Sequence, residues 1–219
     1  MPSPASVIDA LDWPRIEADL AARGCATTGR LLGPRQCAAL AAMYDEPRHF
    51  RSRVVMQRHG FGQGEYQYLA YPLPEPVAAW RAALYQRLAP LANAWAQAMG
   101  LPADYPAAHA DYLARCHAAG QQRPTPLLLR YDENDYNCLH QDLYGELQFP
   151  LQLTVLLSRP GEDFTGGEFV LTEQRPRMQS RAEVVPLAQG EAVIFAVNQR
   201  PVTGLSLIHI SEPTRQEAI

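Results

Sequence analysis

The chain has 219 residues, of which 47% are hydrophobic and 19% are charged, and its formal net charge is −4. This length predicts one or two domains with a sizeable core. The acidic balance, with a pI near 5.9, gives no indication of a nucleic-acid partner or of an anionic-membrane surface. All 19 basic residues are arginine, which together with abundant alanine is typical of a GC-rich bacterial gene.

The four cysteines are scattered, and none of them forms a C-x-x-C pair. This usage favours reduced thiols in a cytosolic protein over a disulfide framework. The N-terminus lacks a basic-then-apolar signal pattern, and no apolar run approaches the ~20 residues that a membrane span needs. We therefore expect a soluble, cytoplasmic protein with no membrane partner.

Helices are expected to dominate the first half of the chain. Apolar periodicity, with proline at helix starts and glycine or proline after helix ends, predicts four of them, and Pro90 is expected to kink or break the third. Two short strands are expected on either side of a glycine-containing loop at 59–64. The predicted helices cover 12–22, 34–44, 75–99 and 106–119, and the two strands cover 52–57 and 65–70.

Short apolar strands replace helices after Pro124. Because no helices intervene between them, they predict an antiparallel sandwich or jelly roll. The expected fold class is therefore α+β, with a mainly helical region at 1–123 packed on a barrel core at 124–204. The predicted strands cover 127–131, 151–157, 168–172, 182–187 and 191–197.

The most informative motif is His140-Gln141-Asp142. Alternation along an extended chain puts residues i and i+2 on one face, so His140 and Asp142 can converge while Gln141 faces away. Two such ligands and a distant histidine make the facial triad of non-heme Fe(II) oxygenases. A lone His-x-Asp is weak evidence, so its sequence context decides its meaning.

That context resembles the metal-binding segment of 2-oxoglutarate/Fe(II)-dependent dioxygenases, in particular their prolyl 4-hydroxylase-like branch. The resemblance covers about residues 124–204, and the segment 116–185 is also similar to bacterial proteins known only as 2OG-Fe(II) oxygenases. The motifs that carry it are Leu128-Leu129-Arg130-Tyr131, the run 135–142 ending in His140-Gln141-Asp142, the Gly-Gly-Glu strand at 163–171 and the turn and strand at 190–195.

The resemblance implies a double-stranded β-helix in which Fe(II) is bound by His140, Asp142 and a distal histidine. It implies a dioxygenase that hydroxylates a protein side chain or small molecule while 2-oxoglutarate and O2 yield succinate and CO2, with ascorbate as a candidate reductant. By its position, Tyr131 would hydrogen-bond the 2-oxoglutarate carboxylate, although an ordinary strand-end aromatic explains Tyr131 equally well.

Two other patterns are set aside. The run 166–169 spells Gly-Gly-Glu-Phe, the diguanylate cyclase signature, but the alternating helices and strands of a nucleotide cyclase are absent, which favours a turn leading into a strand. The glycine-containing loop at 59–64 precedes no helix and no Lys-Ser/Thr, so it is expected to be a hairpin loop near the mouth of the site and not a phosphate loop.

The residues after Gly204 break the family pattern. The run 205–215 resembles the translation of a sequencing-library adapter, so we expect 205–219 to be a non-native tail and exclude it from the fold. The distal histidine and the basic residue that would pair with the far carboxylate of 2-oxoglutarate are then unassigned. His209 could imitate the missing ligand, but neither it nor Arg215 is assigned a role.

Three hypotheses therefore remain open. The parent gene encodes a 2-oxoglutarate/Fe(II) dioxygenase, and the chain as printed is expected to be inactive. Alternatively, the chain is only a catalytically dead fragment, since the loss of a barrel strand leaves a sheet edge unpaired. The third hypothesis is a cupin-like module that holds another metal or none. The substrate cannot be identified from the sequence, because one fold serves many reactions.

Overall fold

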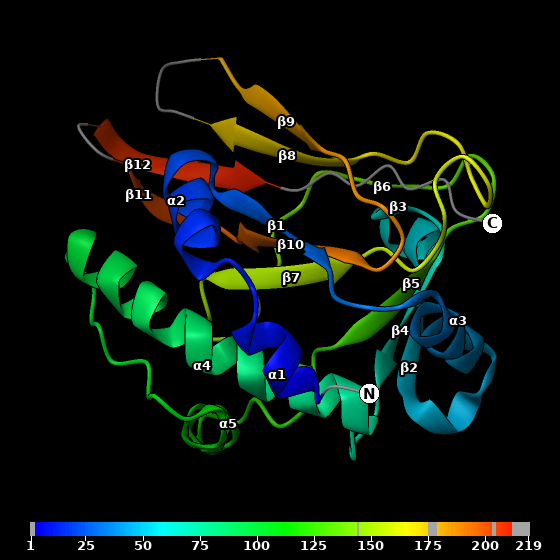
Figure 1. The fold of residues 1–219 in the computed structure, drawn as a ribbon, viewed down its shortest axis with the longest axis horizontal. Helices are drawn as coiled ribbons and strands as arrows, with labels where there is room; N and C mark the ends of the chain where they lie inside the picture. The colour runs from blue at the N-terminus through cyan, green and yellow to red at the C-terminus, as the bar shows by residue number, and fades with distance from the viewer. Residues whose placement is uncertain (1–2, 144, 175–178, 203–204, 212–219) are drawn as a thin grey trace.

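The computed structural model describes residues 3–143, 145–174, 179–202 and 205–211, and for 202 and 205–211 it describes the backbone alone. Helices and antiparallel sheets together confirm the predicted α+β class. Figure 1 shows the long helix α4 along one side of the sheet that contains β7, with the β8–β9 pair on the opposite side.

The central sheet has the order β1-β10-β7, and both pairings are antiparallel. Its middle strand β10 is buried from Ala192 to Ala196, as expected of a continuous apolar run that is covered on both faces. Its edge strand β1 was not predicted. The bounds are Cys25–Arg30 for β1, Leu151–Val155 for β7 and Glu191–Ala196 for β10.

A second sheet has the order β11-β12-β8-β9. Helix α2 is tied to this sheet by Arg200, which is 1% exposed and donates hydrogen bonds of 2.6 and 3.1 Å to the carbonyls of Ala21 and Ala22. The bounds are Phe169–Gln174 for β8, Arg181–Val185 for β9, Gln199–Val202 for β11 and Leu205–Ser211 for β12.

Two smaller sheets lead towards the His-x-Asp motif. One has the order β2-β4-β5, and the other pairs β3 with β6. The bounds are Phe50–Val55 for β2, Gly62–Gln63 for β3, Glu65–Leu69 for β4, Leu127–Arg130 for β5 and Tyr136–Asn137 for β6.

The helices lie where the sequence predicts them, with one addition at the N-terminus. Helix α4 runs through Pro90 as one element, so the break considered at that residue is absent. None of the helices in the described part of the chain combines the length and hydrophobicity of a membrane span. The bounds are Pro4–Asp9 for α1, Trp13–Arg23 for α2, Pro34–Ala42 for α3, Glu75–Ala98 for α4 and His109–Ala118 for α5, with 3-10 turns η1 at Met43–Asp45, η2 at Pro47–His49 and η3 at Met56–His59.

Strand pairing joins the two regions that the sequence analysis separates at residue 123. Strand β1 pairs with β10, and β4 pairs with β5. The region 1–123 therefore supplies strands to the sheets as well as helices to their surface. The division into domains and the double-stranded β-helix both stay predictions.

The segment from residue 205 also enters the fold. Strand β12 lies between β11 and β8 and pairs antiparallel with both. The segment was expected to lie outside the fold, whereas its backbone is part of a sheet. Whether the segment is native is a separate matter and stays a prediction; residues 203–204 and 212–219 lie outside the described part of the chain.

A close backbone contact between Gly190 and Leu32 fixes the position of the start of β10. Gly190 has a φ of +79°, and a Cβ atom there would lie 2.0 Å from the carbonyl oxygen of Leu32. The carbonyl of Gly190 in turn accepts hydrogen bonds from the amides of Leu31 and Leu32 at 2.8 and 3.1 Å. Only glycine combines this conformation with this approach.

We expect Gly190→Ala to lower the free energy of unfolding by about 3 kcal/mol or more, because left-handed strain adds to a steric overlap with backbone. Gly161→Ala is the matched control: Gly161 has a φ of +81°, but no atom lies within 4 Å of its would-be Cβ. That variant should lose only about 1 kcal/mol. Urea denaturation measures both, and equal losses would contradict the contact argument.

His109 makes stability depend on pH. Its ring packs against Tyr85 with centroids 5.4 Å apart, and burial, followed by the charge of Arg81, lowers its pKa to about 4. The unfolded chain takes up this proton near pH 6.5. Stability should therefore fall as the pH falls from about 6.5 to about 4, because the unfolded state then binds the additional proton.

We expect His109→Gln to reduce the loss of stability between pH 7 and pH 4. Thermal melts of the wild type, of this variant and of the exposed-site control His59→Gln measure the effect. Carboxylates titrate in the same window in all three proteins, so the difference between the melting curves isolates His109. Parallel stability profiles for the wild type and His109→Gln would exclude this contribution.

Candidate functional site

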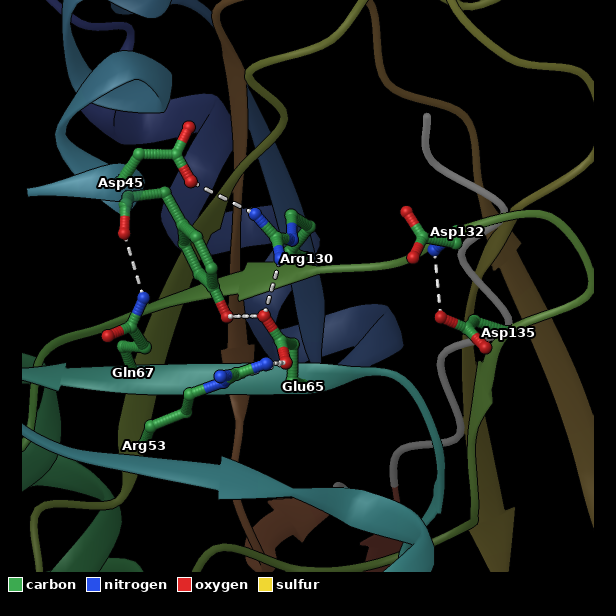
Figure 2. A network of polar contacts seen from close by, with 8 residues as sticks. Asp45, Arg53, Glu65, Gln67, Arg130, Asp132 and Asp135 are labelled. Atoms are coloured by element: carbon green, nitrogen blue, oxygen red, sulfur yellow. Dashed lines mark hydrogen bonds and ion pairs between the residues drawn. The ribbon is translucent and has the colours of Figure 1, made fainter.

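The candidate site begins where β5 ends. Tyr131 follows β5 directly and is 1% exposed. A tight turn comes next, in which the amide of Asp132 donates a 2.8 Å hydrogen bond to the Asp135 carboxylate, as Figure 2 shows. The chain then enters β6, so the turn sets the path from Tyr131 towards the His-x-Asp motif.

The glycine-containing loop expected near the mouth of the site lies against β6. Gly62 is opposite Asn137 in the β3–β6 pair, and the amide of Cys138 donates a 2.8 Å hydrogen bond to the carbonyl of Phe61. This pairing holds the segment that leads into His140. The site is thus built from two chain segments that are far apart in the sequence.

His140 and Asp142 converge as the i, i+2 spacing predicts, although both lie outside the named strands, between β6 and β7. The His140 Nε2 and Asp142 Oδ1 atoms are 3.5 Å apart. His140 Nδ1 is 2.9 Å from the carbonyl oxygen of Cys138. Because a carbonyl can only accept, Nδ1 carries a proton, and in the neutral imidazole the lone pair is then on Nε2, on the side of Asp142.

Two further residues interact with Asp142, Gln152 by a hydrogen bond and Tyr68 electrostatically, and the sequence assigned a role to neither. Gln152 donates a 3.1 Å hydrogen bond from Nε2 to Asp142 Oδ2. Burial, and then the negative charge of Asp142, raises the pKa of Tyr68, while the guanidinium of Arg51 lies 4.3 Å from the Tyr68 ring centroid. The sequence could have indicated Gln152, because a glutamine within the apolar run of β7 is unusual. No comparable pattern marks Tyr68.

The remaining predicted site residues are only partly described. Gln141 donates a 3.4 Å hydrogen bond to Asn198, away from the two ligands. The register of β12 places the backbone of His209 opposite Gln199, next to Asn198, but the side chain of His209 and all of Arg215 lie outside the described residues. Among the side chains that are described, no third His, Cys, Asp or Glu completes a metal-binding group.

The donor set fits two of the three protein ligands of an Fe(II) centre. It joins one imidazole nitrogen with its tautomer set by a backbone acceptor to one carboxylate that a glutamine orients. The side chains of His140 and Asp142 are 33% and 26% exposed, so the centre would be open to small molecules. Tyr131 is joined to it through the turn and β6.

Comparison with known proteins identifies the family. The profile of the family Oxygenase-NA, described as "Oxygenase, catalysing oxidative methylation of damaged DNA", matches residues 64–211. The uncharacterized proteins MT2286 and Rv2227, from two strains of Mycobacterium tuberculosis, are each 51% identical over 131 residues, which cover 60% of this chain. The matched part spans only 56% of each relative's length.

Solved structures are more distant. A Pseudomonas putida prolyl-4-hydroxylase superposes with a TM-score of 0.49 at 15% identity, covering 97% of this chain and 99% of its own. An oxidoreductase of the 2OG-Fe(II) oxygenase family from Burkholderia pseudomallei gives 0.45 at 12% identity, covering 94% and 91%. Both scores are below 0.5, so these likenesses carry no functional argument. The profile match covers more than half of the chain, including His140 and Asp142, so the chain belongs to the Oxygenase-NA family, and the resemblance to oxygenases found in its sequence is confirmed.

Proposed function

We propose that the protein is a non-heme Fe(II)- and 2-oxoglutarate-dependent oxygenase. The observation that supports this most directly is the 3.5 Å approach of His140 Nε2 and Asp142 Oδ1 in a member of an oxygenase family. In the overall reaction, one oxygen atom of O2 enters the substrate and the other enters succinate, while 2-oxoglutarate loses CO2. Cupin-like binding of another metal would use the same two ligands without this turnover.

Each residue of the site has a proposed role. His140 and Asp142 hold the metal, which, when bound, supplies the redox chemistry that a protein side chain cannot. The Cys138 carbonyl keeps the His140 imidazole in the tautomer that leaves Nε2 unprotonated. Gln152 fixes the second oxygen of Asp142, so that Oδ1 stays directed towards His140. Tyr131 donates a hydrogen bond to a carboxylate of 2-oxoglutarate.

The substrate class has two candidates. The sequence predicts a protein side chain or small molecule as substrate and no nucleic acid, whereas the family description names damaged DNA. The turn beside the site carries Asp132, Glu133 and Asp135, whose negative charge would oppose a phosphate backbone passing directly over it. A base delivered into the site from unpaired DNA would need a path that avoids this turn.

Incubation with an alkylated single-stranded oligonucleotide, its unmodified counterpart or a proline-containing peptide separates these substrates. Mass spectrometry would show an added oxygen, or the loss of an alkyl group, on the true substrate class. Selective change of the alkylated oligonucleotide would overturn the expectation that no nucleic acid is a partner. Selective hydroxylation of the peptide would support that expectation.

We expect Fe(II)- and O2-dependent conversion of 2-oxoglutarate to succinate by a version in which the predicted non-native tail, 205–219, is replaced by the sequence of the parent gene. The chain as printed is assayed beside it. His140→Ala should abolish the conversion. Tyr131→Phe should raise the KM for 2-oxoglutarate about tenfold, the worth of one hydrogen bond to a charged group. Tyr105→Phe is the control, because its phenol donates to the Gln148 carbonyl at 2.9 Å, away from the ligands.

Four outcomes of this assay distinguish the hypotheses. Turnover only in the version with the natural continuation supports the inactive-fragment prediction, and turnover in both overturns it. Turnover in neither version, together with stoichiometric metal binding, favours the cupin-like module. Turnover that survives His140→Ala contradicts the proposed ligand set.

Removal of the amide that orients Asp142 should weaken metal binding without removing a ligand. We expect Gln152→Leu to lower the affinity for Fe(II) by a factor of about 10 to 100. Gln189→Leu is the matched control, because Gln189 is also partly buried and donates to a backbone carbonyl, that of Leu157, at 2.9 Å. Anaerobic titration with Fe(II) measures both variants, and equal affinities would exclude the orienting role.

A further inference from the structure

Glu65, in β4, is the centre of a polar network that the proposed function does not use (Figure 2). Its side chain is 13% exposed. Oε1 accepts a 3.1 Å hydrogen bond from the Tyr44 hydroxyl and lies 2.8 Å from Arg130 Nη2. Oε2 accepts from Arg53 Nε at 2.8 Å and also from Arg53 Nη2. One carboxylate thus joins η1, β2 and β5 to β4.

The network stabilises Glu65 as a carboxylate. Burial alone would raise the pKa of Glu65, but hydrogen bonds from Arg53 and Tyr44 and the charge of Arg130 outweigh it and lower the pKa. Arg130 is held from further sides, because its guanidinium lies 4.5 Å from the Tyr44 ring centroid and 3.1 Å from Asp45. Arg130 therefore cannot turn away from β4 without losing several contacts at once.

The network lies one residue away from the proposed 2-oxoglutarate ligand. Glu65 and Arg130 are direct partners in the β4–β5 register. Their neighbours, Gly64 and Tyr131, are in contact: a Cβ on Gly64 would lie 2.8 Å from Tyr131 Cδ1, and Gly64 has a φ of +108°. The backbone at Gly64, directly before β4, therefore packs against the Tyr131 ring. A shift of β4 along β5 would move this support away from the ring.

The chain that follows Tyr131 is also constrained. The turn closed by the hydrogen bond between Asp132 and Asp135 comes directly after Tyr131 and leads towards β6 and His140 (Figure 2). Tyr131 has little freedom of its own, since it is 1% exposed. Its placement therefore depends on the position of the β5 backbone, which the Arg130–Glu65 pair holds.

We propose that Glu65 is a positioning residue for 2-oxoglutarate binding, acting through its ion pair with Arg130 to hold Tyr131 in the ligand site; this rests on the proposed function. Glu65 itself touches neither metal nor ligand in this role. Replacement of Glu65 by glutamine keeps the shape of the side chain and removes its charge. It therefore weakens the ion pair with Arg130 while the Tyr131 hydroxyl group stays present.

A double-mutant cycle tests this proposal. The cycle uses the version, with the printed or the natural C-terminus, that converts 2-oxoglutarate to succinate. In anaerobic calorimetric titrations of the Fe(II)-loaded protein, Glu65→Gln should raise the Kd of 2-oxoglutarate about tenfold. In the turnover assay it should raise the KM for 2-oxoglutarate with little change in kcat. In the Tyr131→Phe background, Glu65→Gln should change the Kd less than about twofold, because the hydrogen bond that it positions is already lost.

Glu183→Gln is the matched control. Glu183 also lies in a strand and sits beside two arginines, with Arg23 at 3.4 Å and Arg181 at 3.5 Å, but it belongs to β9. It should leave the Kd of 2-oxoglutarate unchanged. If Glu65→Gln does not fold, Arg53→Gln removes one partner of the carboxylate and should act in the same direction with a smaller effect.

A second readout needs neither metal nor ligand. Amide hydrogen exchange across 127–131 should accelerate in Glu65→Gln and not in Glu183→Gln. A wild-type protein that fails to bind 2-oxoglutarate overturns the proposed function and this proposal with it. Two results overturn the positioning role alone. One is that the wild type binds 2-oxoglutarate and Glu65→Gln binds it with the same Kd. The other is that Glu65→Gln changes the Kd equally in the wild-type and Tyr131→Phe backgrounds.

Discussion

The placement of β10 is the constraint on which the rest of the molecule depends. This strand pairs with β1 on one edge and β7 on the other, and Val193, Ile194 and Phe195 are at most 1% exposed. A register shift of one residue would turn its side chains to the opposite face of the sheet, so the strand is held in place by packing as well as by hydrogen bonds. Gly190 sets where it begins, because its Cα lies against the Leu32 carbonyl.

Residues that pair with β10 or follow it hold the segment that contains the candidate metal ligands. Gln152, which holds Asp142, is the register partner of Phe195, and Asn198, which holds Gln141, follows the end of β10. The ligands themselves lie in an irregular segment between β6 and β7. A loop can present ligands accurately when rigid elements hold it at several points, and here β6, β7 and the end of β10 supply those points.

The family description and the charge of this chain point to different substrate classes. The family description names damaged DNA, while this chain is acidic overall and carries three acidic residues in the turn beside Tyr131. Both statements are compatible with the proposed metal site, because the residues that would bind a metal and the surface that would select a substrate are separate features of a fold. The matched relatives are also longer than the part that this chain spans.

The sequence by itself determined the helices, the apolar strands and the pair His140 and Asp142, because periodicity and i, i+2 spacing are local properties. It did not reveal β1, since Cys25–Arg30 has small and polar residues and becomes a strand through its pairing with β10. Nor did it indicate the hydrogen bond of Gln152 to Asp142 or the ion pair of Glu65 with Arg130. Only the tertiary structure decided these contacts. Strand β1 and Glu65 pair with segments far away in the chain, and Gln152 reaches Asp142 from β7 across the loop that holds the ligands, so no local pattern records them.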